Sequence, residues 1–272
     1  MIRLLVCNQR GGVGKTTTVV TLARCFAEKG KRTLVIDMDP QGSIQSLLGL
    51  NPQYHLYNFL IERRTLSDCV VHMNGIEGGS LDILASNRST NEAEIMLYKE
   101  TLREFILATL MREAERDYDV VLVDTSPSIS LFQNCAAVYC QNTIIPIDMD
   151  VLSVQGAYAT LHAQGALLAM LQTANQKIPM QIVGLLPLKV HRGLQSTDIV
   201  LRSLQKMSEQ LDIPVLPAIR TDQSVQRASR KKSFLSDIEP KSKALEDYMI
   251  LAEHLLQNIK EPNVSGQSPA QV

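Results

Sequence analysis

Short apolar segments alternate with longer segments of helical period along the whole chain. The apolar segments are continuous runs, which is typical of parallel strands that are buried on both faces. Seven strands are predicted: Ile2–Cys7, Arg32–Ile36, Leu81–Ala85, Val120–Val123, Thr143–Ile147, Ile182–Leu186 and Val215–Ile219. Five helices are predicted between and after them: Thr16–Lys29, Lys99–Arg116, Ser153–Leu171, Leu194–Leu211 and Pro240–Ile259.

This alternation predicts an α/β fold with a twisted, mainly parallel sheet that is flanked by helices on both faces. A chain of 272 residues, 45% of them hydrophobic, can bury one sizeable core. No linker-like stretch interrupts residues 1–259, so we expect one domain there. Residues 260–272 are rich in small, amide, Gly and Pro residues, and we expect them to form a disordered polar tail.

Charge and cysteine content narrow the class of protein. The 27 basic and 28 acidic side chains nearly cancel, so nucleic-acid binding would require a local basic patch. The five cysteines form no C-x-x-C pair and lie mostly in apolar stretches, which favours reduced, buried thiols over a metal or redox site. No segment has the pattern of a signal peptide or of a ~20-residue membrane span. We therefore expect a cytoplasmic protein.

The amphipathic segment 244–259 is the one candidate for a membrane-surface helix. Its polar face carries Glu246, Asp247 and Glu253, whereas a membrane-surface helix would carry Lys and Arg. Packing onto the domain is therefore the better interpretation, and no membrane partner is expected.

A glycine-rich loop follows the first predicted strand and leads directly into a helix. Glycines without a Cβ let successive backbone N–H groups curl around phosphate oxygens, and the helix N-terminus adds partial positive charge. Lys15 is expected to reach the β- and γ-phosphates of ATP, and the Thr16 hydroxyl to bind Mg²⁺. A turn that merely packs helix on strand is the alternative, and the strand–loop–helix context disfavours it. The expected nucleotide-binding residues are Gly11, Gly12, Val13, Gly14, Lys15, Thr16 and Thr17.

Acidic side chains follow two later strands. Asp37 and Asp39 end the second strand, and Asp124 ends the apolar run Val120–Val123. Carboxylates at the carboxyl ends of parallel strands face the crevice where Mg²⁺ and an attacking water would lie. Asp124 is expected to hold the Mg²⁺ shell through water. For Asp37, a merely structural role as a loop cap is the alternative.

These motifs together resemble the ParA–MinD family of deviant Walker A ATPases, whose loop is written K-G-G-x-G-K-T. The chain has R-G-G-V-G-K-T at Arg10–Thr16, D-M-D-P-Q-G-S at Asp37–Ser43 and D-T-S-P-S at Asp124–Ser128. Ser126 stands where the family has a proline. I-I-P at Ile144–Pro146, S-V-Q-G at Ser153–Gly156 and V-G-L-L at Val183–Leu186 extend the resemblance along nearly the whole chain, which looks like the short ParA/Soj form without a helix-turn-helix module.

The resemblance implies roles for individual residues. Asp39 would orient or activate the attacking water, and Asp37 would support the metal site. Arg10 stands where the family has a lysine that contacts the partner's phosphates in a nucleotide sandwich dimer. Arginine keeps this charge but forks onto two oxygens, so it is not a simple substitute for lysine. The alternative for Arg10 is a surface arginine beside an anionic ligand.

A local excess of basic residues lies between residues 189 and 232. Such a patch would bind DNA phosphates without reading the base sequence. The resemblance implies this binding, because members of the ParA–MinD family bind DNA in this way when they are dimeric. Ordinary solvated helix faces are the alternative. The nine cations are Lys189, Arg192, Arg202, Lys206, Arg220, Arg227, Arg230, Lys231 and Lys232. The strongest candidates for DNA binding are Arg230, Lys231 and Lys232, with Arg227, Arg202 and Lys206 beside them.

The function implied by the resemblance is a Mg²⁺-dependent ATPase cycle. ATP would drive a homodimer, the dimer would bind nucleoid DNA, and a cargo-bound adaptor protein would stimulate hydrolysis. The cargo would be a plasmid, a chromosome origin, a chemoreceptor cluster or a protein organelle such as a carboxysome. Two alternatives remain: a DNA-independent switch of the MinD type, and a metabolic enzyme on the same scaffold.

Overall fold

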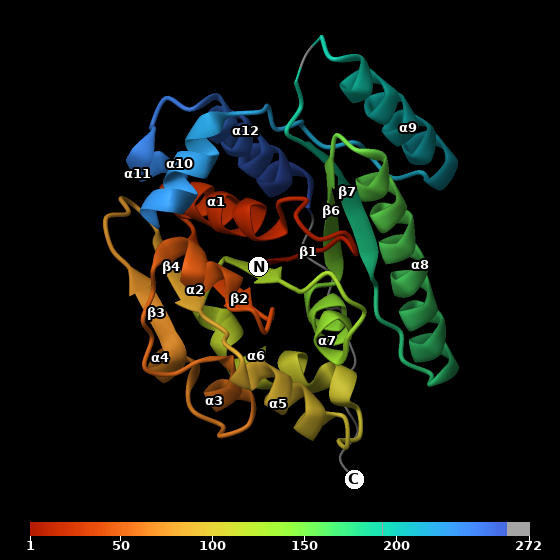
Figure 1. Cartoon of the computed structure of the whole chain (residues 1–272). Helices are drawn as coiled ribbons and strands as arrows, with labels where there is room; N and C mark the ends of the chain where they lie inside the picture. Colours follow the sequence, from red (N-terminus) through yellow and green to blue (C-terminus); the bar gives the residue numbers. More distant parts are fainter. Residues whose placement is uncertain (192, 260–272) are drawn as a thin grey trace.

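A computed structural model describes residues 1–191 and 193–259 and has a seven-stranded sheet at its centre (Figure 1). Arg192 and the expected polar tail lie outside the described residues. The strands are β1 (Ile2–Val6), β2 (Arg32–Asp37), β3 (Val70–Met73), β4 (Ser80–Leu84), β5 (Val120–Asp124), β6 (Asn142–Asp148) and β7 (Gln181–Leu188). Their order is β3-β4-β2-β5-β1-β6-β7, and β3 alone among these seven is antiparallel to its neighbour. The predicted α/β class and the mainly parallel sheet are confirmed.

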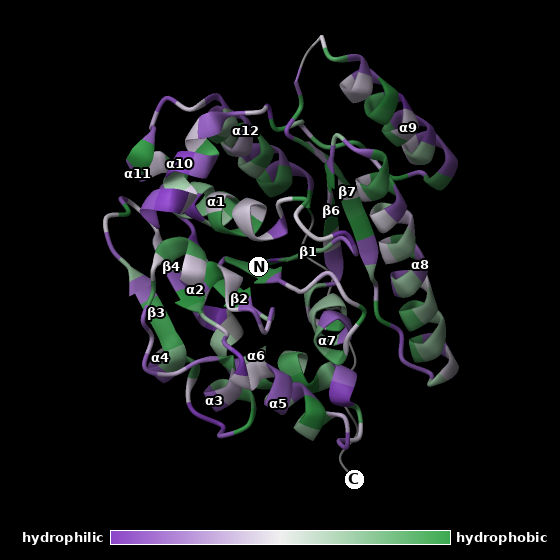
Figure 2. Ribbon diagram, viewed as in Figure 1, coloured by the Kyte–Doolittle hydropathy of each residue, from purple (hydrophilic) through white to green (hydrophobic). Residues whose placement is uncertain are grey.

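The helices cover both faces of this sheet. They are α1 (Lys15–Glu28), α2 (Ser43–Leu48), α3 (Leu56–Leu60), α4 (Leu66–Cys69), α5 (Ser89–Leu97), α6 (Ile106–Ala114), α7 (Leu131–Cys140), α8 (Val151–Thr173), α9 (Gln195–Leu211), α10 (Gln223–Lys231), α11 (Leu235–Ile238) and α12 (Lys243–Asn258), with 3₁₀ turns η1 (Arg103–Phe105) and η2 (Glu115–Asp117). Alternate residues of β1 explain the layers. Leu4 and Val6 enter a core with α1, α2 and α12, whereas Leu5 and Cys7 enter a core with α3, α5, α6 and α7. In Figure 2 the central strands are accordingly coloured largely as hydrophobic.

Two expectations about elements are corrected, and one strand is new. The predicted strand Val215–Ile219 follows the outer edge of β7 and forms one isolated bridge with it, between Val215 and Leu185, while a second bridge joins Arg220 to Val190 just beyond β7. Pro217 has no N–H to donate, so this segment cannot complete a ladder. The predicted helix Lys99–Arg116 starts later, as α6, because Leu102 has a left-handed backbone (φ 55°) before η1. The short strand β3 was not predicted.

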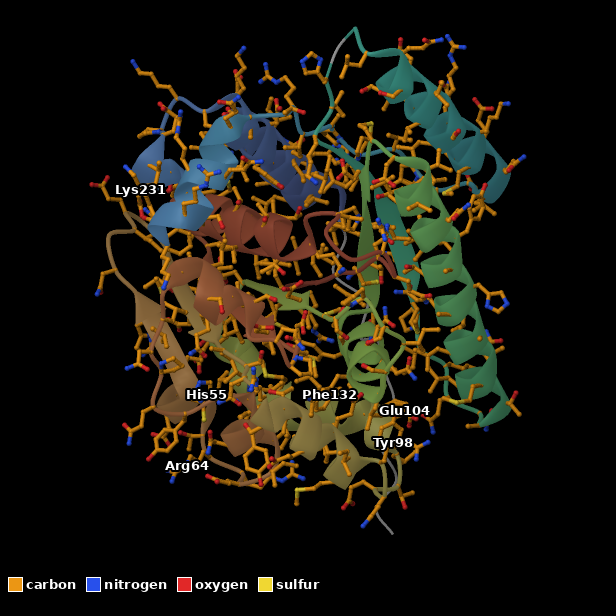
Figure 3. The ribbon with its side chains drawn as sticks, viewed as in Figure 1. His55, Arg64, Tyr98, Glu104, Phe132 and Lys231 are labelled. Atoms are coloured by element: carbon orange, nitrogen blue, oxygen red, sulfur yellow. The ribbon has the colours of Figure 1, made fainter. Side chains whose placement is uncertain are left out.

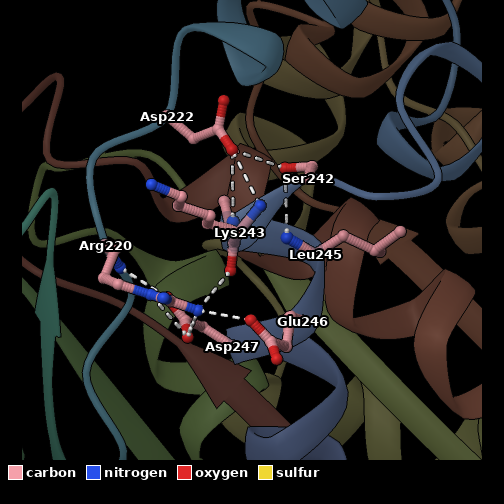
Figure 4. Close-up of polar contacts among 8 residues, drawn as sticks. Arg220, Asp222, Ser242, Lys243, Leu245, Glu246 and Asp247 are labelled. Carbon is pink, nitrogen blue, oxygen red and sulfur yellow. Dashed lines mark hydrogen bonds and ion pairs between the residues drawn. The ribbon is translucent and has the colours of Figure 1, made fainter.

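The segment predicted as Pro240–Ile259 is α12, and it packs onto α1 as expected. Its N-terminus is fixed by a polar cluster (Figure 4). Ser242 caps the helix by accepting a hydrogen bond from the Leu245 N–H, and Asp222 accepts from the Ser242 hydroxyl and the Lys243 N–H, both at 2.9 Å. No helix in the described part of the chain is both long and apolar enough to span a membrane.

Candidate functional site

The phosphate loop lies at the carboxyl edge of the sheet, between β1 and α1. Gly12 (φ 77°) and Gly14 (φ 100°) have left-handed backbones that residues with a Cβ adopt at a cost. Lys15 is buried, and its ammonium donates to the carbonyls of Asn8 (3.2 Å) and Arg10 (3.1 Å). Burial lowers the pKa of Lys15, while the carboxylates of Asp124 and Asp39 oppose this shift. The loop therefore holds a buried cation that faces acidic groups.

Helix α8 positions the start of this loop, which the sequence did not reveal. The buried Asn8 amide donates to the carbonyls of Pro146 (2.8 Å) and Ser153 (3.2 Å), and its oxygen accepts from the Arg10 N–H. The Gln9 N–H donates to Thr160 on α8. A Cβ on Gly156 would lie 2.3 Å from the Asn8 oxygen, so this glycine allows helix and loop to approach. The available signal was the S-V-Q-G segment, where the glycine marked a close approach.

The two predicted aspartates at the strand ends are direct neighbours. Asp37 on β2 is in register with Asp124 on β5, and both are fully buried. Asp37 accepts the N–H groups of Asp39 (3.0 Å) and Ile44 (3.2 Å), so it also serves as the loop cap considered above. Burial, together with the Asp124 charge, raises the pKa of Asp37 well above its ordinary value. Its support of a metal stays a prediction.

Asp124 fits a hydrated Mg²⁺. Burial raises the pKa of Asp124 to about 7, and the Thr16 hydroxyl and the Lys15 ammonium oppose this shift. Neither carboxylate oxygen accepts a hydrogen bond of good geometry from another described residue. Mg²⁺ usually binds one or two carboxylates and keeps several waters, whose hydrogens would satisfy such oxygens. The described residues contain no cluster of three or more His, Cys, Asp or Glu that could hold a metal ion.

Asp39 lies in the tight turn after β2. Its carboxylate accepts the Gln41 N–H at 2.9 Å, and its carbonyl accepts from the Ser86 hydroxyl and from the Gly42 N–H. Gly42 has φ 60°, and a Cβ there would lie 2.8 Å from the Ser86 carbonyl oxygen. The side chain is 8% exposed. These contacts fix the position of Asp39. Among the hydrogen bonds of the described residues, none reaches its second carboxylate oxygen.

A small, largely apolar cavity of about 120 Å³ opens beside the loop. It adjoins Gly14 and Thr17 at the start of α1. The sequence did not indicate this cavity, because its walls come from four separate segments. They include Leu188, Lys189, Ile219, Thr221, Val225 and Tyr248.

The eight described cations of the predicted basic segment, which leave out Arg192, do not form one patch. Helix α9, which carries Arg202 and Lys206, lies apart from α10, which carries Arg227, Arg230 and Lys231 (Figure 1). Arg220 is bound by Asp247 and Glu246 (Figure 4). Arg227 pairs with Glu239 at 3.1 Å, and Lys189 pairs with Asp148.

Two groups of candidate cations remain available. Arg230, Lys231 and Lys232 are exposed at the end of α10, where Figure 3 shows Lys231 at the molecular surface, and Arg202 and Lys206 are exposed on α9. None of these five side chains has an ion pair within residues 1–191 and 193–259.

All five cysteines are buried free thiols, as predicted. Burial raises the pKa of Cys7 and Cys25 to about 12 and that of Cys69 to about 11, and it also raises those of Cys135 and Cys140. These thiols therefore stay protonated at neutral pH and are poor nucleophiles.

Known proteins are similar to this chain in sequence and in fold. Soj of Bacillus subtilis, named a sporulation initiation inhibitor protein, is 27% identical over 258 residues, which cover 94% of this chain and 98% of Soj. An uncharacterized protein of Mycobacterium tuberculosis is 36% identical over 157 residues, or 56% of this chain and 48% of that protein. The chain thus spans about half the length of that curated relative.

Some of the similar solved structures contain a bound nucleotide and magnesium. Cobyrinic acid a,c-diamide synthase from Mycobacterium smegmatis, with bound ADP and magnesium, is 26% identical at a TM-score of 0.76, covering 94% of this chain and 95% of that one. Another structure of that protein contains an ATP analogue and magnesium. These ligands agree with the ATP and Mg²⁺ predicted from the phosphate loop.

The family model that matches this chain covers most of it. The AAA_31 model, described as an AAA domain, matches residues 2–179, which include the phosphate loop and all three aspartates. The resemblance drawn from the motifs is confirmed, since Soj is similar over nearly its whole length. The chain therefore belongs to the AAA_31 family, and it is similar to proteins that carry the names of the ParA and Soj chromosome-partitioning proteins.

Proposed function

We propose that this protein is a Mg²⁺-dependent ATPase that dimerises on ATP, binds DNA without sequence preference and positions or partitions a cargo. The observation that carries this proposal is the meeting of Lys15, Asp39 and Asp124 at one edge of the sheet. Lys15 would bind the phosphates, Asp124 would hold the Mg²⁺ water shell, and Asp39 would orient the attacking water. In this cycle the ATP-bound dimer associates with the nucleoid, and a cargo-bound adaptor stimulates hydrolysis.

Arg10 supports the dimer part of this proposal. Its side chain is exposed at the mouth of the phosphate loop, and it makes no hydrogen bond or ion pair with any residue that the structure describes. Only its backbone is engaged, through the Asn8 oxygen and the Lys15 ammonium. Because only the backbone is fixed, the guanidinium is free to form two hydrogen bonds to the phosphates bound by a second copy of the protein.

Arg10→Ala is expected to leave ADP binding by the monomer within about twofold and to weaken ATP-driven dimerisation by about tenfold or more, the loss of one charge-assisted contact. Calorimetry with ADP and sedimentation with ATP measure the two effects. Arg10→Lys, which restores the residue of the family pattern, should keep the dimer. An equal loss of ADP and ATP binding in Arg10→Ala would place the guanidinium in the site of its own subunit.

The basic C-terminal end of α10 supports the proposal that the protein binds DNA. Arg230 and Lys231 lie in the last turn of this helix and Lys232 caps it, so three cations project from one exposed surface. Lys232 also touches α2 with its alkyl chain, since a Cβ on Gly49 would lie 3.1 Å from its Cδ. Helix α2 directly follows the turn that contains Asp39, so this cluster lies close to that turn.

Replacing Arg230, Lys231 and Lys232 together by alanine is expected to weaken DNA binding on all sequences alike. The slope of log affinity against log salt should fall by about 0.9 for each lost phosphate contact on duplex DNA, or by roughly five for a dimer that presents the cluster twice. The measurement is a salt titration of DNA binding with ATP and with ADP. ATP hydrolysis without DNA should not change.

The matched control is Arg202→Ala with Lys206→Ala on α9, which removes exposed cations from the second candidate surface. The α10 assignment predicts a normal slope for this control. A reversed pattern would move DNA binding to α9. If the unaltered protein shows no ATP-dependent DNA binding at low salt, the MinD-type switch becomes the better reading.

An amide-forming enzyme is the second candidate, because a similar solved structure carries the name of a diamide synthase. Release of ammonia from glutamine requires a nucleophile such as a reactive thiolate. Each cysteine of the described chain is buried, and burial raises the pKa of each. The thiols thus offer no support for this chemistry.

A further inference from the structure

Lys189 lies at the phosphate loop, although it comes from a distant part of the chain. It directly follows β7, and its ammonium is 2.5 Å from the Asp148 carboxylate at the end of β6. The same nitrogen is 3.4 Å from the carbonyl oxygen of Gly12. The sequence grouped Lys189 with DNA-binding cations, but the structure places it against the nucleotide site.

The backbone of Lys189 is held in an uncommon conformation. Its φ is 54°, in the left-handed region that residues with a Cβ rarely adopt. The Thr221 hydroxyl donates to the Lys189 carbonyl at 2.7 Å, and the Val190 N–H donates to the Ile219 carbonyl at 3.0 Å. Such conformations persist where the surroundings fix them, and they concentrate at functional sites. The turn after β7 is therefore built to direct this side chain.

Three carbonyl groups of the loop are covered by two lysines. The Lys15 ammonium donates hydrogen bonds to the carbonyls of Asn8 and Arg10, and the Lys189 ammonium donates to the carbonyl of Gly12. A carbonyl that turned toward the phosphates would repel them, whereas inward N–H groups attract them. Lys15 is also needed by the phosphates themselves, but Asp148 holds Lys189 outside the loop. Lys189 can thus keep its contact with Gly12 while a nucleotide is bound.

We propose that Lys189 and Asp148 form a latch that holds the phosphate loop in its nucleotide-binding conformation. Lys189 is a positioning residue in this scheme, since it acts through Gly12. The inference rests on the nucleotide-binding part of the proposed function and is independent of DNA and of the adaptor. Because the Lys189 side chain is 52% exposed and that of Asp148 is 22% exposed, the effect is moderate and weakens with salt.

The test is steady-state ATP hydrolysis by Lys189→Met, which keeps the length of the side chain and removes its charge. The latch predicts a KM for ATP that rises about threefold to tenfold with kcat within about twofold, the pattern of lost uniform binding. Asp148→Asn should give a similar rise in KM. The double variant should have the same KM as Lys189→Met alone, because each substitution removes the same Lys189–Asp148 ion pair. Lys189→Arg should restore most of the affinity. The difference from the unaltered protein should shrink at high salt.

Two controls separate the latch from a structural role. Lys189→Gly tolerates the positive φ without strain, so it should raise KM as Lys189→Met does if the ammonium is what matters. Lys177→Met removes another exposed lysine, in the loop before β7 at the opposite edge of the sheet, and should leave KM unchanged. The melting temperature without nucleotide should be the same in Lys189→Met and Lys177→Met as in the unaltered protein, whereas the stabilisation added by ATP should be smaller without the latch.

A Lys189→Met variant with normal KM, or one whose kcat falls tenfold at normal KM, would overturn the latch. So would a Lys189→Gly variant that binds ATP as tightly as the unaltered protein. An unaltered protein that does not bind ATP at all would instead overturn the proposed function. The two failures are therefore distinguishable in one set of measurements.

Discussion

Lys15→Ala is expected to lower the affinity for ATP by at least about 100-fold, or about 2.7 kcal/mol of binding free energy. The Lys15 ammonium is buried and points into the loop, where it donates to the carbonyls of Asn8 and Arg10. Phosphate oxygens would replace these neutral acceptors with charged ones, and such charge-assisted hydrogen bonds are about twice as strong. Isothermal calorimetry with ATP and Mg²⁺ measures the loss.

Stability separates this result from a folding defect. Burial lowers the pKa of Lys15, which means that the folded, nucleotide-free site disfavours its charge. Lys15→Met, which keeps the volume and removes the charge, is therefore expected to melt no lower than the unaltered protein without nucleotide. Unchanged ATP affinity in either variant would show that the loop is not the binding site.

Asp39→Asn is expected to bind ATP and to hydrolyse it about 100-fold or more slowly, the usual range for the loss of a group that orients or activates an attacking water. The carboxamide oxygen can still accept the Gln41 N–H, so the turn after β2 keeps its hydrogen bond. The protein should then accumulate as an ATP-bound dimer, because hydrolysis no longer returns it to the monomer. Phosphate release and size-exclusion chromatography measure the two effects.

Asp39→Ala serves as the matched comparison. It removes the turn hydrogen bond as well as the carboxylate, so it should show the same slow hydrolysis with a stability lower by about 1 kcal/mol. Normal turnover in Asp39→Asn, without dimer accumulation, would remove Asp39 from the mechanism. Slow turnover in Asp39→Ala alone would assign Asp39 to the shape of the turn.

The sequence by itself determined the fold class and the centre of the site, because their signals are local. The six confirmed strands of the parallel sheet are continuous apolar runs, and burial on both faces requires that pattern. The phosphate loop is one contiguous segment whose glycines, lysine and threonine have fixed spacing. Asp37 and Asp124 were predictable as neighbours because strands of a parallel sheet end at a common edge, and their register bears this out.

Only the tertiary structure decided which polar groups meet across long stretches of chain. Asn8 is fixed by Ser153, for which the glycine of S-V-Q-G was the one local signal, and the turn at Lys189 is fixed by Thr221, a contact that no local pattern marks. The predicted basic segment likewise included Lys189, Arg220 and Arg230 together, with Arg230 among its strongest candidates. The fold bonds the first to Asp148 and the second to Asp247, and it leaves the third on the surface. The partner of a charge depends on how separate elements pack, and that packing is a property of the folded chain.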